Sequence, residues 1–433
     1  MKINISCLTI ALVAMTASTG DAQQRPPVRQ LGPTVGKTTE TFMNVSAVRP
    51  LSNGSVLVND AGGRRVLLFN PQLNSFTLVA DSTSATANAY GSRIGGLIAY
   101  RGDSTLFVDP TSMSMLVIDP SGKIARVMSV PRAQDAAVLS GILGSPALAP
   151  NGKLVYRSTP NFQTRSLTTG QAGPGQPGFQ MPEIPDSAPV VRIDMATRQV
   201  DTVGFIKTPR IKMDVSRDDK GNVRMSSQIN PLPVVDDWAM TPDGAIALVR
   251  GRDYHVDWVN PDGSKLSSAK IPFDWQRLSD EDKVAFIDSV KAARAKQGAG
   301  APTALTPGGG GGNSQVFVFG GPGGGASGGA PPRGGSPQFQ QTFIPAGDLP
   351  DYKPPFFAGS TRADMEGNLW IRTIPTSAIA GGPVYDVINR KGELVDRVQI
   401  AAGRTIVAFG PSGAVYLVNR DGATVTIERA SVK

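Results

Sequence analysis

A short phrase recurs six times along this chain, and it constrains the fold more than any single residue does. Each copy has a turn containing glycine, an alternating apolar run, a second polar turn and a second run. In the first copy, residues 54–70 read Gly-Ser-Val-Leu-Val-Asn-Asp-Ala-Gly-Gly-Arg-Arg-Val-Leu-Leu-Phe-Asn. Repeats of roughly 40–50 residues stack on one another and share a core. The phrase therefore predicts one all-β repeat architecture rather than several domains.

The first turn of every copy aligns on its glycine. The six dipeptides are Asn53-Gly54, Gly102-Asp103, Asn151-Gly152, Asp243-Gly244, Glu366-Gly367 and Ser412-Gly413. Such dipeptides are typical of tight type I′ hairpin turns, which need positive φ at both central residues. Six copies predict a six-bladed β-propeller. The last copy ends after its third strand, at 424–429, so we expect the N-terminal segment 27–43 to supply the missing outer strand and close the ring.

The spacing of these glycines locates insertions in the repeat. Three intervals are 48, 50 and 46 residues long, whereas Gly152 to Gly244 spans 92 residues and Gly244 to Gly367 spans 123. The excess predicts a Pro/Gly-rich loop at 158–187, an extra β-hairpin at 210–230 and a long insertion at 275–355. These lie within one propeller domain predicted over 23–433.

The long insertion is predicted to begin with a helix. Ser279 followed by Asp282 is a capping-box pattern, and the helix is expected to end near Gly298. Its apolar face is predicted to carry Val284, Phe286, Ile287 and Val290. The Gly- and Pro-rich residues 299–340 cannot bury enough apolar surface to order themselves, which predicts disorder there.

The N-terminus indicates export. Residues 1–22 have a short basic start, an apolar run and small residues before a cleavage site, which predicts a signal peptide and a secreted or periplasmic protein. The only cysteine, Cys7, lies inside this segment, so the mature chain has no disulfide. The formal net charge is +8, but the basic residues are scattered singly, which argues against a nucleic-acid partner. No run is long enough to span a membrane, and we expect a monomer.

Residues 54–70 resemble the repeat of NHL-type and TolB-like six-bladed β-propellers. Residues 349–356, followed by 362–364 and 367–372, resemble a subgroup of exported bacterial propellers. The resemblance implies the fold over nearly the whole mature chain, but no particular reaction. A ligand-binding, protein-binding or scaffold module is the function class that it favours.

Arginines gather where a propeller presents its ligands, at the channel mouth. The second strands are expected to end at Asn59, Asp109, Arg157, Arg250, Arg372 and Asn419, and the innermost strands to begin near Asp236, Asp237, Arg362 and Arg404. Guanidinium groups bind carboxylate and phosphate oxygens in a planar fork. The pattern predicts a basic mouth that takes an anionic small molecule or an acidic protein surface. In the alternative interpretation, the arginines pair with carboxylates such as Asp60, Asp237 or Asp364 and only stabilise the fold.

A competing hypothesis is a divalent-metal-dependent lactonase of the gluconolactonase-like type. Asp236 and Asp237 could hold Ca²⁺ or another hard cation. That family uses Glu and Asn ligands, and the sequence places neither clearly beside this pair. We therefore expect no cofactor, and a hydrogen-bonding role for both aspartates.

Two rarer residue types narrow the chemistry further. His255 is the only histidine, which excludes zinc sites with several His ligands and favours a packed strand residue over a catalytic one. Trp238, Trp258 and Trp370 fall within strand patterns and are predicted to lie in the core. Trp275 is the tryptophan predicted to be exposed.

Overall fold

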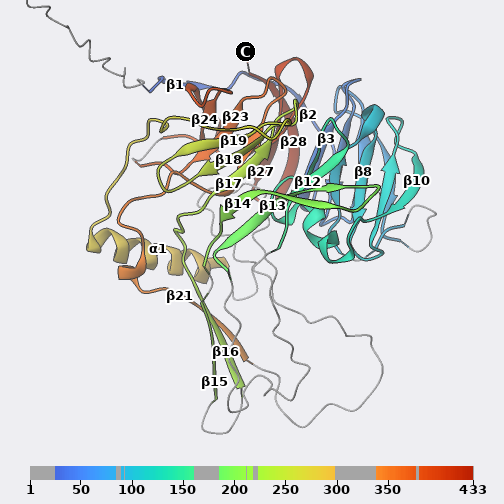
Figure 1. Cartoon of the computed structure of the whole chain (residues 1–433). Coiled ribbons are helices and arrows are strands. Elements are labelled where there is room, and N and C mark those ends of the chain that lie inside the picture. The colour runs from blue at the N-terminus through green and yellow to red at the C-terminus, as the bar shows by residue number, and fades with distance from the viewer. Residues whose placement is uncertain are drawn as a thin grey trace, which may run out of the picture.

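The computed structural model describes residues 25–83, 89–91, 93–159, 185–210, 212–217, 223–297, 338–376 and 380–432. Figure 1 shows a ring of β-sheets, with one helix and a small separate sheet lying to one side of it. The ring consists of six sheets of four or five strands, and most of the remaining chain is turns and loops. The predicted six-bladed β-propeller is confirmed.

Each blade is a meander in which consecutive strands pair antiparallel. The strands of blades 1 to 3 are β3 (Val45–Pro50), β4 (Val56–Asp60), β5 (Arg65–Phe69) and β6 (Phe76–Asp81); β7 (Gly96–Ala99), β8 (Thr105–Asp109), β9 (Ser114–Ile118) and β10 (Ile124–Ser129); and β11 (Ala147–Leu148), β12 (Lys153–Arg157), β13 (Ser187–Asp194) and β14 (Val200–Lys207). Those of blades 4 to 6 are β17 (Asp237–Met240), β18 (Ile246–Arg250), β19 (His255–Val259) and β20 (Lys265–Ser267); β22 (Phe356–Ala363), β23 (Leu369–Thr373), β24 (Val384–Ile388) and β25 (Leu394–Gln399); and β26 (Arg404–Phe409), β27 (Ala414–Asp421) and β28 (Thr424–Ser431).

The N-terminal segment closes the ring, as predicted, and does so through two strands. β2 (Thr34–Lys37) pairs antiparallel with β28 and becomes the outer strand of blade 6. β1 (Val28–Gln30) pairs parallel with β25 and adds a fifth strand to blade 5. The first and last parts of the chain are thus hydrogen-bonded to each other, and blades 5 and 6 gain covered edges.

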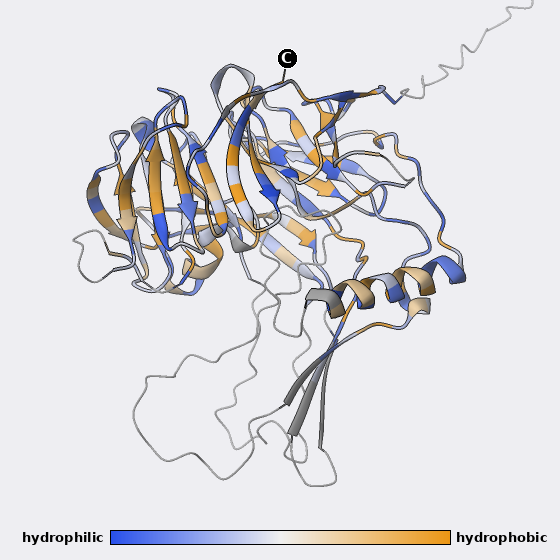
Figure 2. Cartoon of the chain, turned by 180° about the vertical axis from the view of Figure 1, so that it is seen from behind, coloured by the Kyte–Doolittle hydropathy of each residue, from blue (hydrophilic) through white to orange (hydrophobic). Residues whose placement is uncertain are grey.

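The core consists of one apolar cluster between each pair of neighbouring blades. Along β4, Val56 and Val58 pack against blade 6, whereas Leu57 packs against blade 2. The other boundaries are filled in the same way, including the one between blades 4 and 5. Figure 2 shows the apolar residues concentrated on the blade strands. The alternation expected for half-buried strands is lost in β4, where all five residues are buried because sheets cover both faces.

The turn glycines all have positive φ, but the turn type differs between blades. Gly54 has φ +84° and its N–H donates to the Leu51 carbonyl, while no positive φ is found at Asn53. That is a type I turn closed by a left-handed glycine rather than the expected type I′ turn. Two copies do have positive φ at both central residues, at Gly102-Asp103 and at Ser412-Gly413.

The insertion near blade 4 forms its own small apolar cluster. α1 (Asp280–Gln297) is capped as predicted, because the Asp282 N–H donates to Ser279 Oγ and the Ser279 N–H to Asp282 Oδ2. Ile287 and Val290 are buried, Ile287 within this cluster, but Val284 is 51 % exposed and lies outside the packed face. The aliphatic stem of Lys283 is buried in its place.

A three-stranded sheet projects from the ring beside α1 (Figure 1). β15 (Lys212–Arg217) and β16 (Val223–Ile229) form the predicted extra hairpin, and β21 (Gln338–Phe343) pairs with β16 in parallel. Residues 338–340, predicted to be disordered, are therefore part of a strand. The rest of that predicted segment, the signal peptide and most of the loop at 158–187 lie outside the described residues.

Short helical turns complete the structure: η1 (Arg101–Asp103), η2 (Ala133–Asp135), the π-helical η3 (Val138–Ile142), η4 (Ala346–Asp348) and η5 (Pro411–Gly413). No helix in the described ranges is long and apolar enough to cross a membrane.

Candidate ligand site at the channel mouth

Innermost strands begin and second strands end at the same face of the ring. Val45 at the start of β3 pairs with Asp60 at the end of β4, and Arg404 at the start of β26 pairs with Asn419 in β27. In blade 4, Asp237 pairs with Val249, next to Arg250. The predicted strand ends of blades 1, 4 and 6 therefore lie at one channel mouth, but their side chains have different environments. The prediction that an innermost strand begins near Arg362 is wrong, because β22 begins at Phe356 and Arg362 pairs with Trp370 next to the end of that strand.

Arg250 is held by two carboxylates of its own blade. Its Nη1 lies 2.8 Å from Asp236 Oδ2 and its Nε 2.7 Å from Asp257 Oδ2. Burial by itself would lower the pKa of Arg250, but the hydrogen bonds and charges of Asp257 and Asp236 outweigh it and raise the pKa. Asp236 also accepts the backbone N–H groups of Lys207 and Gly251. This group stabilises the fold and has no free donor fork to offer a ligand.

Arg404 is similarly neutralised. Its Nε and Nη2 lie 2.6 Å and 3.2 Å from the two carboxylate oxygens of Glu428. Asn419 and Thr34 also donate to this carboxylate, at 2.8 Å and 3.3 Å. Burial alone would raise the pKa of Glu428, but these partners lower it. Because Thr34 belongs to β2, the cluster ties the closing strand to blade 6.

The remaining polar strand ends fix loops. Asn59 donates its amide to the Gly95 carbonyl of blade 2 at 2.8 Å. Asp109 accepts from the N–H groups of Gly91 and Thr111 and from Ser112 Oγ. These hydrogen bonds hold the chain in place, and neither side chain belongs to a group of free donors.

Arg157 differs from Arg250 and Arg404. Its guanidinium makes no ion pair or hydrogen bond with any described residue, and its Nε is buried without a partner. Burial lowers its pKa, and the charge of Asp237 partly counteracts that shift. Arg157 as a whole is half-buried, and removing part of a cation from water without a partner is costly. Arg157 therefore has hydrogen-bond donors that no acceptor in the described part of the chain satisfies.

Asp237 is the carboxylate near this arginine, and its own interactions are with backbone. It is 5 % exposed, and its Oδ2 accepts the Thr361 N–H at 2.8 Å. Burial raises the pKa of Asp237, and the hydrogen bonds that it accepts oppose this only in part. Asp237 thus links blade 4 to β22 of blade 5 without forming an ion pair with Arg157.

Further buried donors belong to the same part of the ring. Arg362 Nε, Trp238 Nε1 and Thr361 Oγ1 are each buried and have no hydrogen-bond partner in the described part of the chain. Arg362 Nη1 reaches Ser145 Oγ, 3.3 Å away, on the segment that leads into blade 3. The neighbouring Gly144 has φ +122°, and a Cβ there would lie 2.9 Å from Trp238 Nε1. Glycine at 144 thus keeps backbone close to the indole nitrogen.

Gly144 and Ser145 connect Trp238 of blade 4 with Arg362 of blade 5, and Asp237, whose charge acts on Arg157 of blade 3, accepts the Thr361 N–H of blade 5. We call the four residues Arg157, Trp238, Thr361 and Arg362 the donor cluster. Its members carry N–H and O–H groups, and native proteins seldom leave such groups buried and unsatisfied. Arg372 lies nearby, since its charge and that of Arg362 both act on the buried Tyr385. The arrangement matches a ligand that supplies several acceptor oxygens.

The metal hypothesis finds little support at this mouth. Asp236 and Asp237 are adjacent in sequence but bind different partners, Arg250 and the Thr361 N–H. Within the described ranges, no three His, Cys, Asp or Glu side chains come together to hold a metal ion. His255 lies at the start of β19, with Nδ1 2.7 Å from Asp253 and Nε2 3.3 Å from Asp257.

The tryptophans are placed as predicted. Trp238, Trp258 and Trp370 are buried, whereas Trp275 is 40 % exposed. The buried, unpartnered Nε1 of Trp238 had no signal in the sequence, because its surroundings include Gly144, which lies far away in the chain.

No protein-family model and no curated protein sequence matches the chain. Among solved structures, the chain is similar to a gluconolactonase from Xanthomonas campestris, with 11 % identity, 94 % of this chain and 99 % of the other covered, and a TM-score of 0.40. Regucalcin, a calcium-binding protein from Agrobacterium tumefaciens, is 10 % identical, and the alignment covers 94 % of this chain and 98 % of regucalcin with a TM-score of 0.40. The PQQ-bound aldose sugar dehydrogenase from Streptomyces coelicolor is 13 % identical, and the alignment covers 94 % of this chain and 99 % of the dehydrogenase with a TM-score of 0.36. Similarity at this level carries no conclusion about activity.

Proposed function

We propose that this protein is an exported binding module that takes an anionic ligand at its channel mouth. The observation that supports the proposal is the donor cluster, in which Arg157 is a half-buried cation with a buried Nε and without an ion pair among the described residues. A carboxylate or phosphate group would satisfy several of these donors at once. The ligand is a small anion or an acidic side chain of a partner protein.

Of the arginines predicted from the sequence, Arg157 and Arg362 carry this proposal. Arg250 and Arg404 have a structural role in this proposal, because carboxylates already pair with their guanidinium groups. In the alternative, a metal-dependent lactonase, Asp236 and Asp237 would hold the cation, but here Asp236 pairs with Arg250 and Asp237 accepts the Thr361 N–H. Export itself, and the closer relation to NHL-type or TolB-like propellers, are part of the proposal.

A thermal-shift screen with a panel of anions tests this function. The probes are mono-, di- and tricarboxylates, phosphate esters and an acidic peptide, each at matched ionic strength. A ligand that binds only the folded state raises the melting temperature, as mass action requires. We expect at least one carboxylate or phosphate to do so, and Arg157→Met or Arg362→Met to remove the shift.

Arg126→Met is the matched control. Arg126 is an exposed arginine on the outer strand β10 of blade 2, outside the donor cluster. It should retain the full ligand-induced shift. The proposal fails if no anion stabilises the wild-type protein, or if the Arg126 variant loses the shift as completely as the Arg157 variant.

A further inference from the structure

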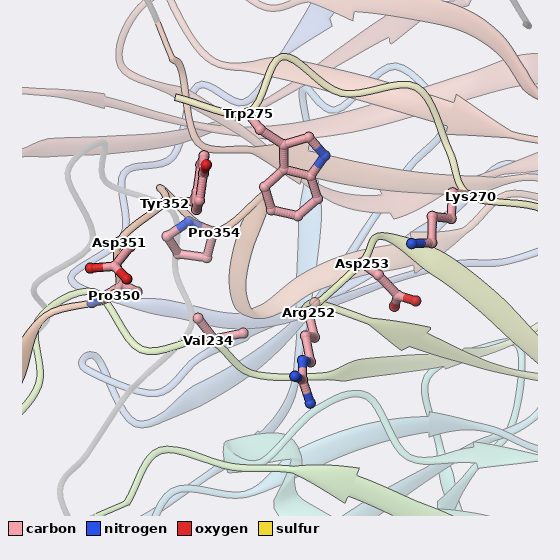
Figure 3. A pocket seen from close by; sticks show the side chains of 10 residues that line it. Val234, Arg252, Asp253, Lys270, Trp275, Pro350, Asp351, Tyr352 and Pro354 are labelled. Carbon is pink, nitrogen blue, oxygen red and sulfur yellow. The ribbon is translucent and has the colours of Figure 1, made fainter. Parts of the chain in front are cut away.

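A second concave site lies where the long insertion meets blade 4. It is a pocket of 370 Å³ between the loop after β18 and two insertion segments. This volume falls within the range of roughly 300–1,000 Å³ that is typical of small-molecule sites. In Figure 3, Trp275, Tyr352 and Pro354 lie on one side, and Asp253 and Lys270 on the other.

Its aromatic wall is unusual because both rings are exposed. Trp275 is 40 % exposed and Tyr352 is 48 % exposed, although both line the same pocket. The two exposed surfaces border one concave pocket, where they form a continuous apolar wall. That wall is accessible to a ligand.

The backbone holds these rings in place. Arg277 and Tyr352 form an antiparallel bridge, with the Lys353 N–H donating to the Gln276 carbonyl at 2.9 Å. Trp275 packs edge-to-face against Phe273, with centroids 5.3 Å apart and planes at 76°. A preorganised aromatic surface binds with little loss of side-chain entropy.

The charged side chains that line the pocket are two acids, Asp253 and Asp351, and two bases. Asp351 is paired with Lys283 at 2.7 Å, and Asp253 Oδ1 lies 2.7 Å from His255 Nδ1. Arg252 and Lys270 also line it and have no ion pair or hydrogen bond with any described residue. The indole nitrogen of Trp275 faces the Lys270 side in Figure 3. The pocket therefore combines an apolar ring surface with free cationic donors.

We infer that this pocket binds an acidic sugar unit, a uronate residue of an oligosaccharide or polysaccharide. The apolar C–H face of a pyranose ring packs against an aromatic ring, and Trp275 and Tyr352 supply that surface. The uronate carboxylate is the counterion for Lys270 and Arg252. A proline-rich peptide would use the aromatic wall but leave both cations unpaired, so the charges favour the acidic sugar.

The test exploits Trp275 as a built-in reporter. The other three tryptophans are at most 4 % exposed, so acrylamide-accessible tryptophan fluorescence comes from Trp275. Oligogalacturonate is the acidic probe, and a neutral xylo-oligosaccharide of equal length is its control. We expect the acidic probe to change this fluorescence and to protect it from acrylamide, and the neutral probe to bind at least about tenfold more weakly.

Variants locate the binding by calorimetry. Trp275→Ala should lose at least about tenfold in affinity for oligogalacturonate, and Arg252→Gln with Lys270→Gln should reduce the preference for the acidic over the neutral probe by about tenfold. Phe205→Ala removes an aromatic side chain that is 59 % exposed on β14 and should change neither. Arg157→Met should leave this binding intact, which separates it from the proposed function of the channel mouth.

Three outcomes would overturn the inference. The first is that oligogalacturonate does not bind the wild-type protein. The second is equal affinity for the neutral sugar, and the third is a proline-rich peptide that binds at Trp275 when the sugars do not. Circular dichroism and the melting temperature confirm that each variant is folded, so a loss of binding is not a loss of structure.

Discussion

The arginines of blades 4 and 6 and those of blades 3 and 5 have opposite environments. Arg157 and Arg250 occupy the same place, at the end of a second strand, whereas Arg404 begins β26 and Arg362 lies next to the end of β22. Arg250 and Arg404 are each held by carboxylates of their own blade or of the segment leading into it. Arg157 has no such partner in the described chain, and Arg362 reaches only Ser145 Oγ and a backbone carbonyl there. Arg157 and Arg250 thus show that equal residue type and equal strand position do not imply equal environment. Their partners separate an arginine that supports the fold from one that we propose as a ligand donor.

The largest expected change in the free energy of unfolding is at Arg250, which has carboxylate partners. Arg250→Met should lower the free energy of unfolding by about 3 kcal/mol, because it leaves Asp236 and Asp257 without their cation. Urea unfolding followed by circular dichroism measures the change. Arg126→Met, on the exposed surface, should stay within about 0.5 kcal/mol of wild type. If Arg250→Met also changes the free energy of unfolding by no more than about 0.5 kcal/mol, its ion pairs do not support the fold.

Glu428→Gln should lower the free energy of unfolding by about 2 kcal/mol at neutral pH. The substitution weakens the contacts that Arg404, Asn419 and Thr34 make with this side chain and that close blade 6. Its partners lower the pKa of Glu428 in the folded state. The carboxylate therefore stabilises the protein above its ordinary pKa, and this contribution is lost as pH falls through the lowered value. The unfolding free energies of the two proteins should converge in acid. A gap that persists at the lowest pH would argue against the ion pair as its cause.

Much of this architecture is predictable from sequence, because glycine turns and apolar runs are local signals. The six turn glycines mark the turns between first and second strands in all six blades, and the incomplete last repeat indicates the closing strand. The partners of an arginine are not local. Arg250 pairs with Asp257 seven residues away, whereas Arg157 is linked to Thr361 of blade 5 only through Asp237 of blade 4. The spacing of these residues in the sequence does not predict that they come close in the fold.

A smaller effect is expected at Asp237. Burial raises its pKa, so the ionised carboxylate reduces stability as pH rises from the ordinary toward the raised value. Asp237→Asn keeps an acceptor for the Thr361 N–H and should change the free energy of unfolding at neutral pH by less than about 1 kcal/mol, toward greater stability. It should also strengthen binding of an anion at the donor cluster and flatten the pH dependence of that binding. Weaker anion binding by this variant would contradict the assignment.

The most direct test of the contrast needs no ligand. It is the free energy of unfolding of Arg157→Met, measured by urea titration beside Arg250→Met. If Arg157 is a donor for an external acceptor, replacing its unpaired, half-buried guanidinium with an apolar side chain leaves stability unchanged or raises it. A loss as large as that of Arg250→Met would mean that Arg157 stabilises the fold, and would contradict the account of the channel mouth as an anion-binding site.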